Sequence, residues 1–344
     1  MKKFVGYMAG VNFSGYERYG NGPVKKEEYS RYTENDFAQV ASWGCDHIRL
    51  PFDSINYTDY TKDNPIIEYG LEAFDKILDW CKKYNLNLVF DMHGAPGFYF
   101  NYNNKNLNSL FENRERQLEY IDSWKILAKR YKNEGANIAF DLLNETIVDG
   151  GYDSGSIKWN KLWREVTDAI HEEAPQRTII VGGNYFNSIN KLENMDIIDD
   201  DRIIYNFHSY FPMMFTHQRI DNPNYTTQVE WPFDSLEHAD FFGGPDKISS
   251  DLIGHVCIDH IWEEFKPVAD FIEKYDRPLY CGEYGVCSNA SLDSKIRWLK
   301  DYMTVFKEYG IGHAVWAYIG FTSLVDGQTR KPISDEVIKL ISEK

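Results

Sequence analysis

Eight short apolar segments rich in β-branched and aromatic residues recur along the chain, alternating with segments whose apolar residues repeat every three to four positions. This alternation predicts an α/β fold, in which helices join the strands of a parallel sheet. Eight strands close a (β/α)8 TIM barrel, so we favour a barrel over an open, doubly wound sheet. The expected strands cover residues 4–13, 46–50, 86–92, 138–143, 178–182, 202–207, 278–281 and 312–317.

Between these strands the spacing of apolar residues predicts amphipathic helices. The i, i+3, i+4, i+7 pattern runs from Leu71 to Cys81 and again from Leu118 to Tyr131. The composition shows no break along the 344 residues, so we predict a single domain over residues 1–344. Further helices are expected over residues 33–43, 156–174, 292–309 and 334–341.

One connection is longer than the pattern requires. From His208 to Glu283 the chain runs 75 residues, against roughly 30 for a whole βαβ unit. The excess, about residues 216–265, contains turn signals built on proline and glycine, including Gly243-Gly244-Pro245, followed by a helical pattern. We therefore predict an inserted subdomain after the sixth strand.

The charge of the chain limits its partners. There are 37 basic and 53 acidic residues, a formal net charge of −16. Such a field repels nucleic-acid phosphates and anionic lipid, so we expect neither a nucleic-acid partner nor a membrane partner. Met1 to Phe13 lacks the pattern of a signal peptide. We expect a cytoplasmic protein, or a secreted one whose signal peptide is absent from this sequence.

Several kinds of reaction lack their sequence motifs here. The chain contains no G-x-x-x-x-G-K-[ST] or G-x-G-x-x-G phosphate loop, no H-E-x-x-H and no G-x-S-x-G. The five cysteines form no C-x-x-C pair, and we read them as mostly buried free thiols. We expect no metal and no cofactor.

Polar and aromatic residues stand where seven of the eight expected strands end. The carboxyl ends of barrel strands meet on one face, which is where barrel enzymes carry out their chemistry. Each residue alone has an ordinary explanation, such as a structural ion pair or ring packing. Together they are costly to bury unless they bind something. They are Arg49, His93, Asn144, Glu145, Asn184, Tyr185, His208, Tyr210, Glu283 and Trp316.

Two glutamates in such a setting suit the cleavage of a glycosidic bond. That reaction needs a carboxylic acid to protonate the leaving oxygen and a carboxylate to attack the anomeric carbon. Arg49 beside Glu283 is expected to keep Glu283 ionised as the nucleophile. The charge of Glu283 would then raise the pKa of Glu145, which would remain protonated as the acid.

The chain resembles the family five glycoside hydrolases, which belong to the large retaining (β/α)8 clan. The recurring residues of that family appear here in order as Arg49, His93, Asn144, Glu145, His208, Tyr210, Glu283 and Trp316. The likeness is strongest to bacterial, clostridial-type endo-1,4-β-glucanases, or cellulases. The likeness extends from about Asn12 to Trp316. The two glutamates are 138 positions apart in the sequence, Glu145 after the fourth strand and Glu283 after the seventh, as in the family. The motifs that carry the likeness are Asp91-Met92-His93, Asn144-Glu145, Asn206-Phe207-His208 and Tyr280-Cys281-Gly282-Glu283.

The resemblance implies a retaining endo-β-1,4-glucanase that hydrolyses internal bonds of cellulose or related β-glucans by double displacement. Glu145 would be the acid/base and Glu283 the nucleophile. The implied supporting roles are Asn144 and His93 on sugar hydroxyls, His208 holding Glu145, Tyr210 and Arg49 holding Glu283, and Trp316 as the floor of the cleavage subsite. Further candidates for substrate contact are Asn184 and Tyr185, with Phe98, Tyr99, Trp231 and Tyr318 as stacking rings.

Three details of geometry follow. Neighbours on a strand point to opposite faces, so the fourth strand must end or bulge for both Asn144 and Glu145 to reach one groove. The family likeness implies a cis peptide bond after Trp316. Retention requires the two carboxyl groups to lie about 5 to 5.5 Å apart, whereas inversion requires about 6.5 to 9.5 Å.

Alternatives remain open at this point. The same chemistry could act on mixed-linkage glucan, mannan or glucomannan, xyloglucan or xylan. The chain could also be a carbohydrate-binding barrel without catalysis, or a metal-dependent barrel hydrolase. We expect a monomer whose partner is a β-linked polysaccharide or oligosaccharide.

Overall fold

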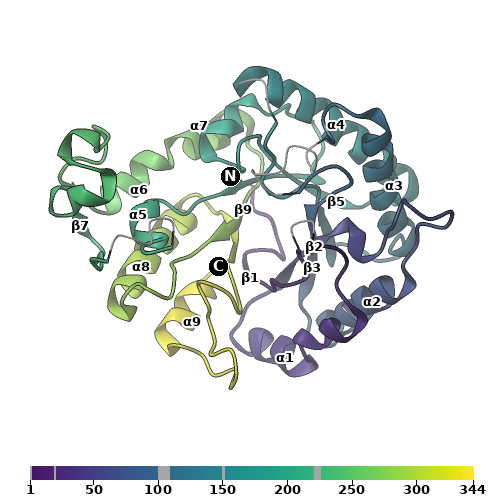
Figure 1. Ribbon diagram of the computed structural model, residues 1–344, viewed down its shortest axis with the longest axis horizontal. Helices are drawn as coiled ribbons and strands as arrows, with labels where there is room; N and C mark the ends of the chain where they lie inside the picture. The colour runs from purple at the N-terminus through teal and green to yellow at the C-terminus, as the bar shows by residue number, and fades with distance from the viewer. Residues whose placement is uncertain (1, 19–20, 100–108, 149–151, 221–225) are drawn as a thin grey trace.

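Eight parallel strands close into a barrel in the computed structural model, which describes residues 2–18, 21–99, 109–148, 152–220 and 226–344 (Figure 1). Each strand pairs with the next in chain order, and the last pairs with the first. The predicted (β/α)8 fold is confirmed. The strands are β1 (Ala9–Asn12), β2 (His47–Asp53), β3 (Asn87–Gly94), β4 (Ile138–Asp141), β5 (Thr178–Gly182), β6 (Ile203–His208), β9 (Leu279–Tyr284) and β10 (Gly312–Val315).

Helices form the outer layer around the barrel (Figure 1). The apolar face predicted between Leu71 and Cys81 is buried against the strands. None of the described helices is long and apolar enough to cross a membrane. The α-helices are α1 (Glu34–Ser42), α2 (Glu68–Lys83), α3 (Arg114–Arg130), α4 (Tyr152–Glu173), α5 (Met213–Thr216), α6 (Ile258–Glu264), α7 (Lys266–Tyr275), α8 (Leu292–Glu308) and α9 (Asp335–Ile341); the 3-10 helices are η1 (Lys26–Arg31), η2 (Ser54–Asn56), η4 (Ile189–Asn194), η5 (Ser235–Phe242) and η6 (Pro245–Lys247).

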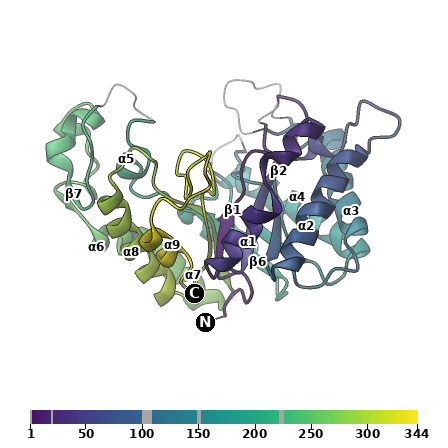
Figure 2. The ribbon, with the colours of Figure 1, turned by 90° about the horizontal axis from the view of Figure 1, so that it is seen from below.

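The long connection between β6 and β9 contains elements of its own. Strands β7 (Phe233–Asp234) and β8 (His255–Val256) pair antiparallel, separately from the barrel. This part of the chain lies at one side of the molecule, next to α6 and α8 (Figures 1 and 2). Trp231 attaches it to α8, because its backbone N–H donates to Ser294 and its indole N–H to Asp301.

The side chains that face into the barrel form layers along its axis. Alternate residues of one strand share a face, so Val89, Asp91 and His93 follow one another upward along β3. The polar groups described below lie above an apolar layer, a stacked arrangement typical of this fold. The apolar layer comprises Val89, Ala139, Ile180, Ile204, Tyr280 and Ala314, with Phe4 and Tyr7 below it.

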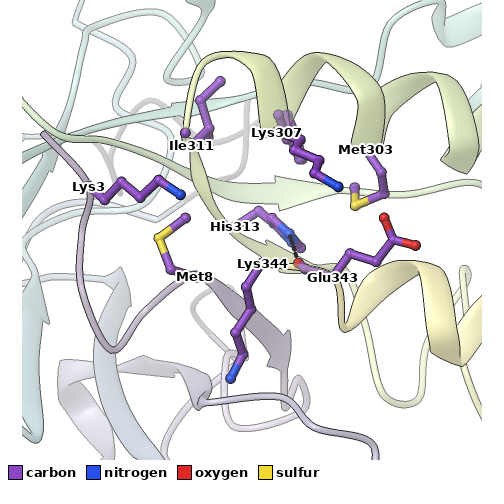
Figure 3. A pocket seen from close by; sticks show the side chains of 10 residues that line it. Lys3, Met8, Met303, Lys307, Ile311, His313, Glu343 and Lys344 are labelled. Carbon is purple, nitrogen blue, oxygen red and sulfur yellow. Dashed lines mark hydrogen bonds between the residues drawn. The ribbon is translucent and has the colours of Figure 1, made fainter. Parts of the chain in front are cut away.

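The two ends of the chain lie close together at the N-terminal end of the barrel (Figure 2). A cavity of about 20 Å³ lies there, lined among others by Lys3, Met8, His313 and Lys344 (Figure 3). That volume suits about one water molecule, so it is too small for a sugar. This end of a (β/α)8 barrel contributes to stability rather than to catalysis.

The five cysteines are free thiols, as predicted. Cys45, Cys81, Cys281 and Cys287 are buried, and Cys257 is partly exposed.

Candidate active site

Irregular strand pairing shapes the C-terminal end of the barrel. The register of β2 with β3 omits His93, and the register of β6 with β9 omits Gly282, directly before Glu283. On the other side of β9, two residues oppose a single residue of β10. Bulges of this kind re-aim a side chain. Both His93 and Glu283 therefore leave regular strand alternation where the barrel opens.

The fourth strand ends before the predicted acid, as expected. β4 stops at Asp141, and Glu145 adopts a left-handed conformation with φ of 42°. The backbone N–H of Asn144 donates to Met92 O of β3 at 2.8 Å, which keeps this turn against the barrel. Asn144 and Glu145 can therefore both face the groove. The predicted cis peptide bond between Trp316 and Ala317 is also present.

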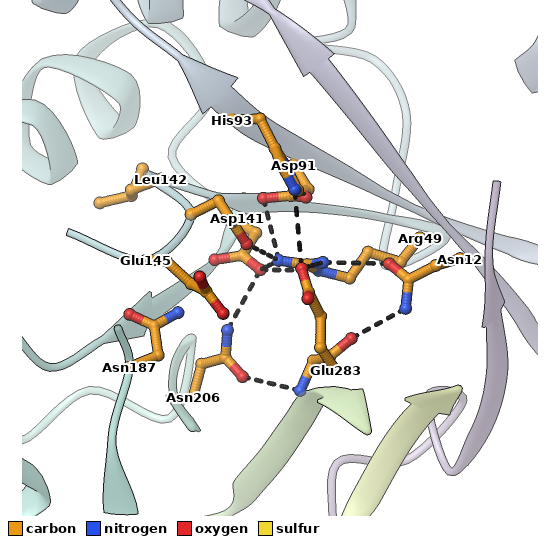
Figure 4. Close-up of polar contacts among 12 residues, drawn as sticks. Asn12, Arg49, Asp91, His93, Asp141, Leu142, Glu145, Asn187, Asn206 and Glu283 are labelled. Atoms are coloured by element: carbon orange, nitrogen blue, oxygen red, sulfur yellow. Dashed lines mark hydrogen bonds and ion pairs between the residues drawn. The ribbon is translucent and has the colours of Figure 1, made fainter. Parts of the chain in front are cut away.

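Glu283 is held at both carboxylate oxygens. Arg49 Nη1 donates to Oε1 at 2.9 Å (Figure 4), and the Tyr210 hydroxyl donates to Oε2 at 2.9 Å. His93 Nε2 lies 3.6 Å from Oε1. The side chain is buried, and the residue is only 5% exposed. This is the arrangement expected of a carboxylate that must keep one fixed orientation.

Glu145 has a different kind of partner. Its Oε1 lies 2.9 Å from Nδ1 of His208, and no guanidinium contacts it among the described residues. A carboxylate oxygen of Glu145 lies within 4.8 Å of one of Glu283. This short approach favours the retaining spacing of about 5 to 5.5 Å over the inverting one of about 6.5 to 9.5 Å.

The surroundings act differently on the two carboxyl groups. Burial raises the pKa of Glu145, and the charge of Glu283 raises it further. Burial also raises the pKa of Glu283. The Arg49 guanidinium lowers the pKa of both groups, but it is hydrogen-bonded to Glu283, where His93 lowers the pKa as well. When the pair shares one proton, Glu145 is therefore the group that holds it. Burial lowers the pKa of His208 well below its usual value, so its imidazole is neutral.

Arg49 is itself held by residues that were not among the predicted site residues. Its Nε donates to Asp141 at 3.0 Å, its Nη1 to Asn12 at 3.0 Å, and its Nη2 lies 3.0 Å from Asp91. Burial raises the pKa of Asp91 and of Asp141 to about 7, against the attraction of Arg49. A signal was available, because each aspartate interrupts an otherwise apolar strand segment, and buried carboxylates are rare unless paired.

The remaining predicted site residues surround the pair. Asn144 accepts from Arg49 Nη2 at 3.0 Å, which leaves its amide N–H groups for a ligand. The indole of Trp316, 8% exposed, stacks on His93 with ring centroids 5.6 Å apart. His93 Nδ1 lies 2.7 Å from Asp91 on the side away from Glu283. These groups offer a ring face and hydrogen-bond donors, which is what a sugar binds.

The further candidates for substrate contact differ in whether they are exposed. Asn184 is buried, and its side chain accepts from Val148 N–H at 3.0 Å, holding the turn after β4. The ring of Tyr185 is 46% exposed at the end of β5. Among the stacking candidates only Tyr99 is partly exposed. The prediction was wrong for Phe98, Trp231 and Tyr318, which are fully buried and have no free ring face.

Two groups of side chains have the composition of a metal site. Asp91, His93 and Glu283 form one, and Glu145, His208 and Glu283 form the other, each with ligand atoms within 4.8 Å of one another. Both depend on Glu283, whose oxygens already accept from Arg49 and Tyr210. A guanidinium at this distance would repel a bound cation. The donor set thus suits proton transfer between carboxyl groups better than cation binding.

Comparison with known proteins gives a consistent result. The profile of the cellulase family (glycosyl hydrolase family 5) matches residues 7–321. Endoglucanase C of Acetivibrio thermocellus is 38% identical over 352 residues, covering 99% of this chain and 99% of that protein. Cellodextrinase A of Ruminococcus flavefaciens is 32% identical, covering 90% of this chain and 85% of that protein.

The solved structure of endoglucanase Cel5A from Thermotoga maritima has the same fold. It superposes with a TM-score of 0.75 at 22% identity, covering 99% of this chain and 100% of that one. The family match and the full-length relatives together identify the protein class. The chain belongs to glycosyl hydrolase family 5, the cellulase family, and is a glycoside hydrolase whose substrate is a carbohydrate.

Proposed function

We propose that the chain is a retaining endo-β-1,4-glucanase that cleaves internal bonds of cellulose or related β-glucans. One observation carries the proposal: carboxylate oxygens of Glu145 and Glu283 approach within 4.8 Å, while Arg49 contacts only Glu283 of the two. The name of the full-length relative from A. thermocellus, an endoglucanase, supports the substrate class. The cellulase family match supports it as well.

In the first step Glu283 attacks the anomeric carbon while Glu145 gives its proton to the leaving oxygen. The bond to the leaving sugar breaks as a covalent bond to Glu283 forms. Arg49 and Tyr210 orient Glu283 for this attack. The buried setting that raises the pKa of Glu145 supplies the proton.

In the second step Glu145, now ionised, takes a proton from water. That water attacks the anomeric carbon and displaces Glu283, so the product keeps the configuration of the substrate. Asn144 and His93 would bind hydroxyls of the sugar in the cleavage subsite, and Trp316 would lie under its ring. Tyr185, whose ring is 46% exposed at the end of β5, would contact a neighbouring sugar.

Anomer analysis tests the mechanism. Proton NMR during early hydrolysis of a cello-oligosaccharide should show the β anomer first, and an initial α anomer would exclude double displacement. A product profile on cellulose, lichenan and glucomannan tests the substrate: mixed oligosaccharides from cellulose and lichenan support the proposal. Preference for glucomannan with no cleavage of cellulose would replace β-glucan by mannan as the substrate.

Substitution of the acid tests the assignment of roles. Glu145→Gln should lower turnover by about 10²- to 10⁴-fold, the usual contribution of general acid–base catalysis, while oligosaccharide affinity is kept. Glu264→Gln is the matched control, since burial also raises the pKa of Glu264 to about 7, but Glu264 lies on the outer helix α6. Turnover at the wild-type rate in Glu145→Gln would disprove the assignment.

A further inference from the structure

The turn after β5 has an unusual backbone. Tyr185, Phe186 and Asn187 are three consecutive non-glycine residues with positive φ, at 66°, 65° and 51°. Such conformations cost free energy and are retained chiefly where the surrounding structure requires them. The N–H groups of Tyr185 and Phe186 donate to Thr146 O, directly after Glu145. The turn after β5 is therefore fastened to the loop that carries the acid.

This turn places Asn187 against His208. Asn187 is fully buried, and its backbone oxygen accepts from His208 N–H at 2.9 Å. Its side-chain amide donates through Nδ2 to Nε2 of His208 at 3.4 Å. The space for this side chain depends on Gly182, because a Cβ there would lie 2.2 Å from Asn187 Oδ1.

His208, which contacts Asn187, also contacts the proposed acid Glu145. The other ring nitrogen of His208, Nδ1, lies 2.9 Å from Glu145 Oε1. The amide of Asn187, the imidazole of His208 and the carboxyl of Glu145 therefore form a continuous chain of contacts. Figure 4 shows the side chains of Asn187 and Glu145 on the same side of the site. Nothing in the sequence or in the family motif singles out Asn187.

We propose that Asn187 is a positioning residue that determines which nitrogen of His208 carries the proton. The inference rests on the proposed function, in which Glu145 is the acid/base. A neutral imidazole has one N–H, and the nitrogen that accepts from the amide cannot be the one that carries it. His208 therefore presents Nδ1–H to Glu145. This donor stabilises the carboxylate that forms after proton donation and acts as base in the second step.

Without Asn187 the ring is free to present either nitrogen. Nδ1 could then accept from the hydroxyl of protonated Glu145 as well as donate to its carboxylate. The bond from this hydroxyl is stronger than the one that the carbonyl oxygen of protonated Glu145 accepts from Nδ1–H in the wild type, so the preference for the carboxylate form is reduced. The pKa of Glu145 should rise, by about half to one unit for one hydrogen bond. The substitution leaves the other charged and titratable groups around the pair in both variants: Arg49, Asp91, His93, Asp141, Tyr210 and Glu283.

The first test is the pH profile of kcat/KM, whose basic limb reports the acid. Asn187→Gly keeps positive φ without strain and should move that limb upward by about half to one unit. Gly182→Ala should do the same, because its methyl group displaces the Asn187 side chain. Asn160→Ala is the control: Asn160 is also a buried asparagine, but it lies on the outer helix α4 and donates to Asn194 O, so the limb should stay in place.

The second test measures which nitrogen of His208 carries the proton. In wild-type protein labelled with ¹⁵N-histidine, NMR should show His208 protonated at Nδ1, with the signal assigned by its loss in His208→Gln. In Asn187→Gly that preference should be lost. Protonation at Nε2 in the wild type, or a basic limb that stays in place in both Asn187→Gly and Gly182→Ala, would overturn the proposal. The NMR result holds even if Glu145 is not the acid, so it separates this inference from the proposed function.

Discussion

Replacing Tyr210 with phenylalanine removes one hydrogen bond from the proposed nucleophile and little else. The hydroxyl donates to Glu283 Oε2 at 2.9 Å, and burial raises the pKa of Tyr210 so far that it remains a donor at any working pH. A hydrogen bond to a charged group contributes about 1.5 to 3 kcal/mol. Since one pKa unit corresponds to about 1.4 kcal/mol, the pKa of Glu283 should rise by about one to two units.

The assay is the pH dependence of kcat/KM, whose acid limb reports the group that must be ionised. That limb should move upward by about one to two units in Tyr210→Phe, which is a ten- to hundredfold loss of kcat/KM well below the limb. Tyr57→Phe is the matched control, because Tyr57 is buried and its hydroxyl also donates a hydrogen bond, but to the neutral oxygen Ser123 O. An acid limb unchanged in Tyr210→Phe would refute the idea that this hydroxyl stabilises ionised Glu283.

Two further predictions concern stability and access. The folded-state pKa of Asp141, about 7, lies above its model-peptide value of 3.8, so the folded protein loses stability as pH rises through this range, on the order of 4 kcal/mol from this group. In Asp141→Asn this part of the pH dependence should vanish. Urea unfolding at pH 4 and pH 7 measures the free energy of unfolding of the wild type and the variant. If the variant lost as much stability between these pH values as the wild type, the raised pKa of Asp141 would be contradicted. Ellman's reagent should label one thiol rapidly in the folded protein, Cys257, and five after denaturation; rapid labelling of more than one would contradict the burial of the others.

Strands and helices could be predicted because burial imposes their periodicity, but their ends depend on contacts that periodicity does not contain. The first strand was predicted from Phe4, whereas β1 begins at Ala9. Gly6 turns the chain with φ of 87°, and the Tyr7 hydroxyl donates to Ala136 O. Phe4 and Tyr7 therefore pack beneath the barrel instead of extending its first strand.

The stacking candidates failed for a related reason. A (β/α)8 barrel buries two layers, the barrel interior and the shell between strands and helices. Large rings such as Trp124 and Trp159 fill that shell. Phe98 and Trp231 join the same apolar cluster, Trp231 through the contact of the insertion with α8. Residue type shows that a ring will be present near a strand end, but its exposed face depends on the helix packed beside it.

The predicted site residues share a property that the missed ones lack. Glu145 and Glu283 stand at or beyond strand ends, which the fold brings to one face whatever the packing. Asp91 and Asp141 lie one layer deeper, and Asn187 lies in a turn. Their roles depend on which side chain they meet across the barrel. A periodic pattern in one sequence does not contain that information.

The deeper layer explains why the two carboxyl groups differ. Among the described residues, Arg49 is the one cation in this layer of polar side chains. Its three nitrogens contact oxygen atoms of residues from β1, β3, β9 and β4 with the turn that follows it. They are Asn12, Asp91, Asp141, Asn144 and Glu283. A planar group bound on all sides cannot turn toward a new partner.

The barrel therefore fixes the position and orientation of the Arg49 guanidinium. Glu283 accepts a hydrogen bond from it because the bulge in β9 directs the Glu283 carboxylate toward the guanidinium. Glu145 lies beyond the end of β4, and its carboxyl group contacts the neutral imidazole of His208 rather than a guanidinium. The asymmetry that double displacement requires is thus built by strand register on one side and by the turn after β5 on the other.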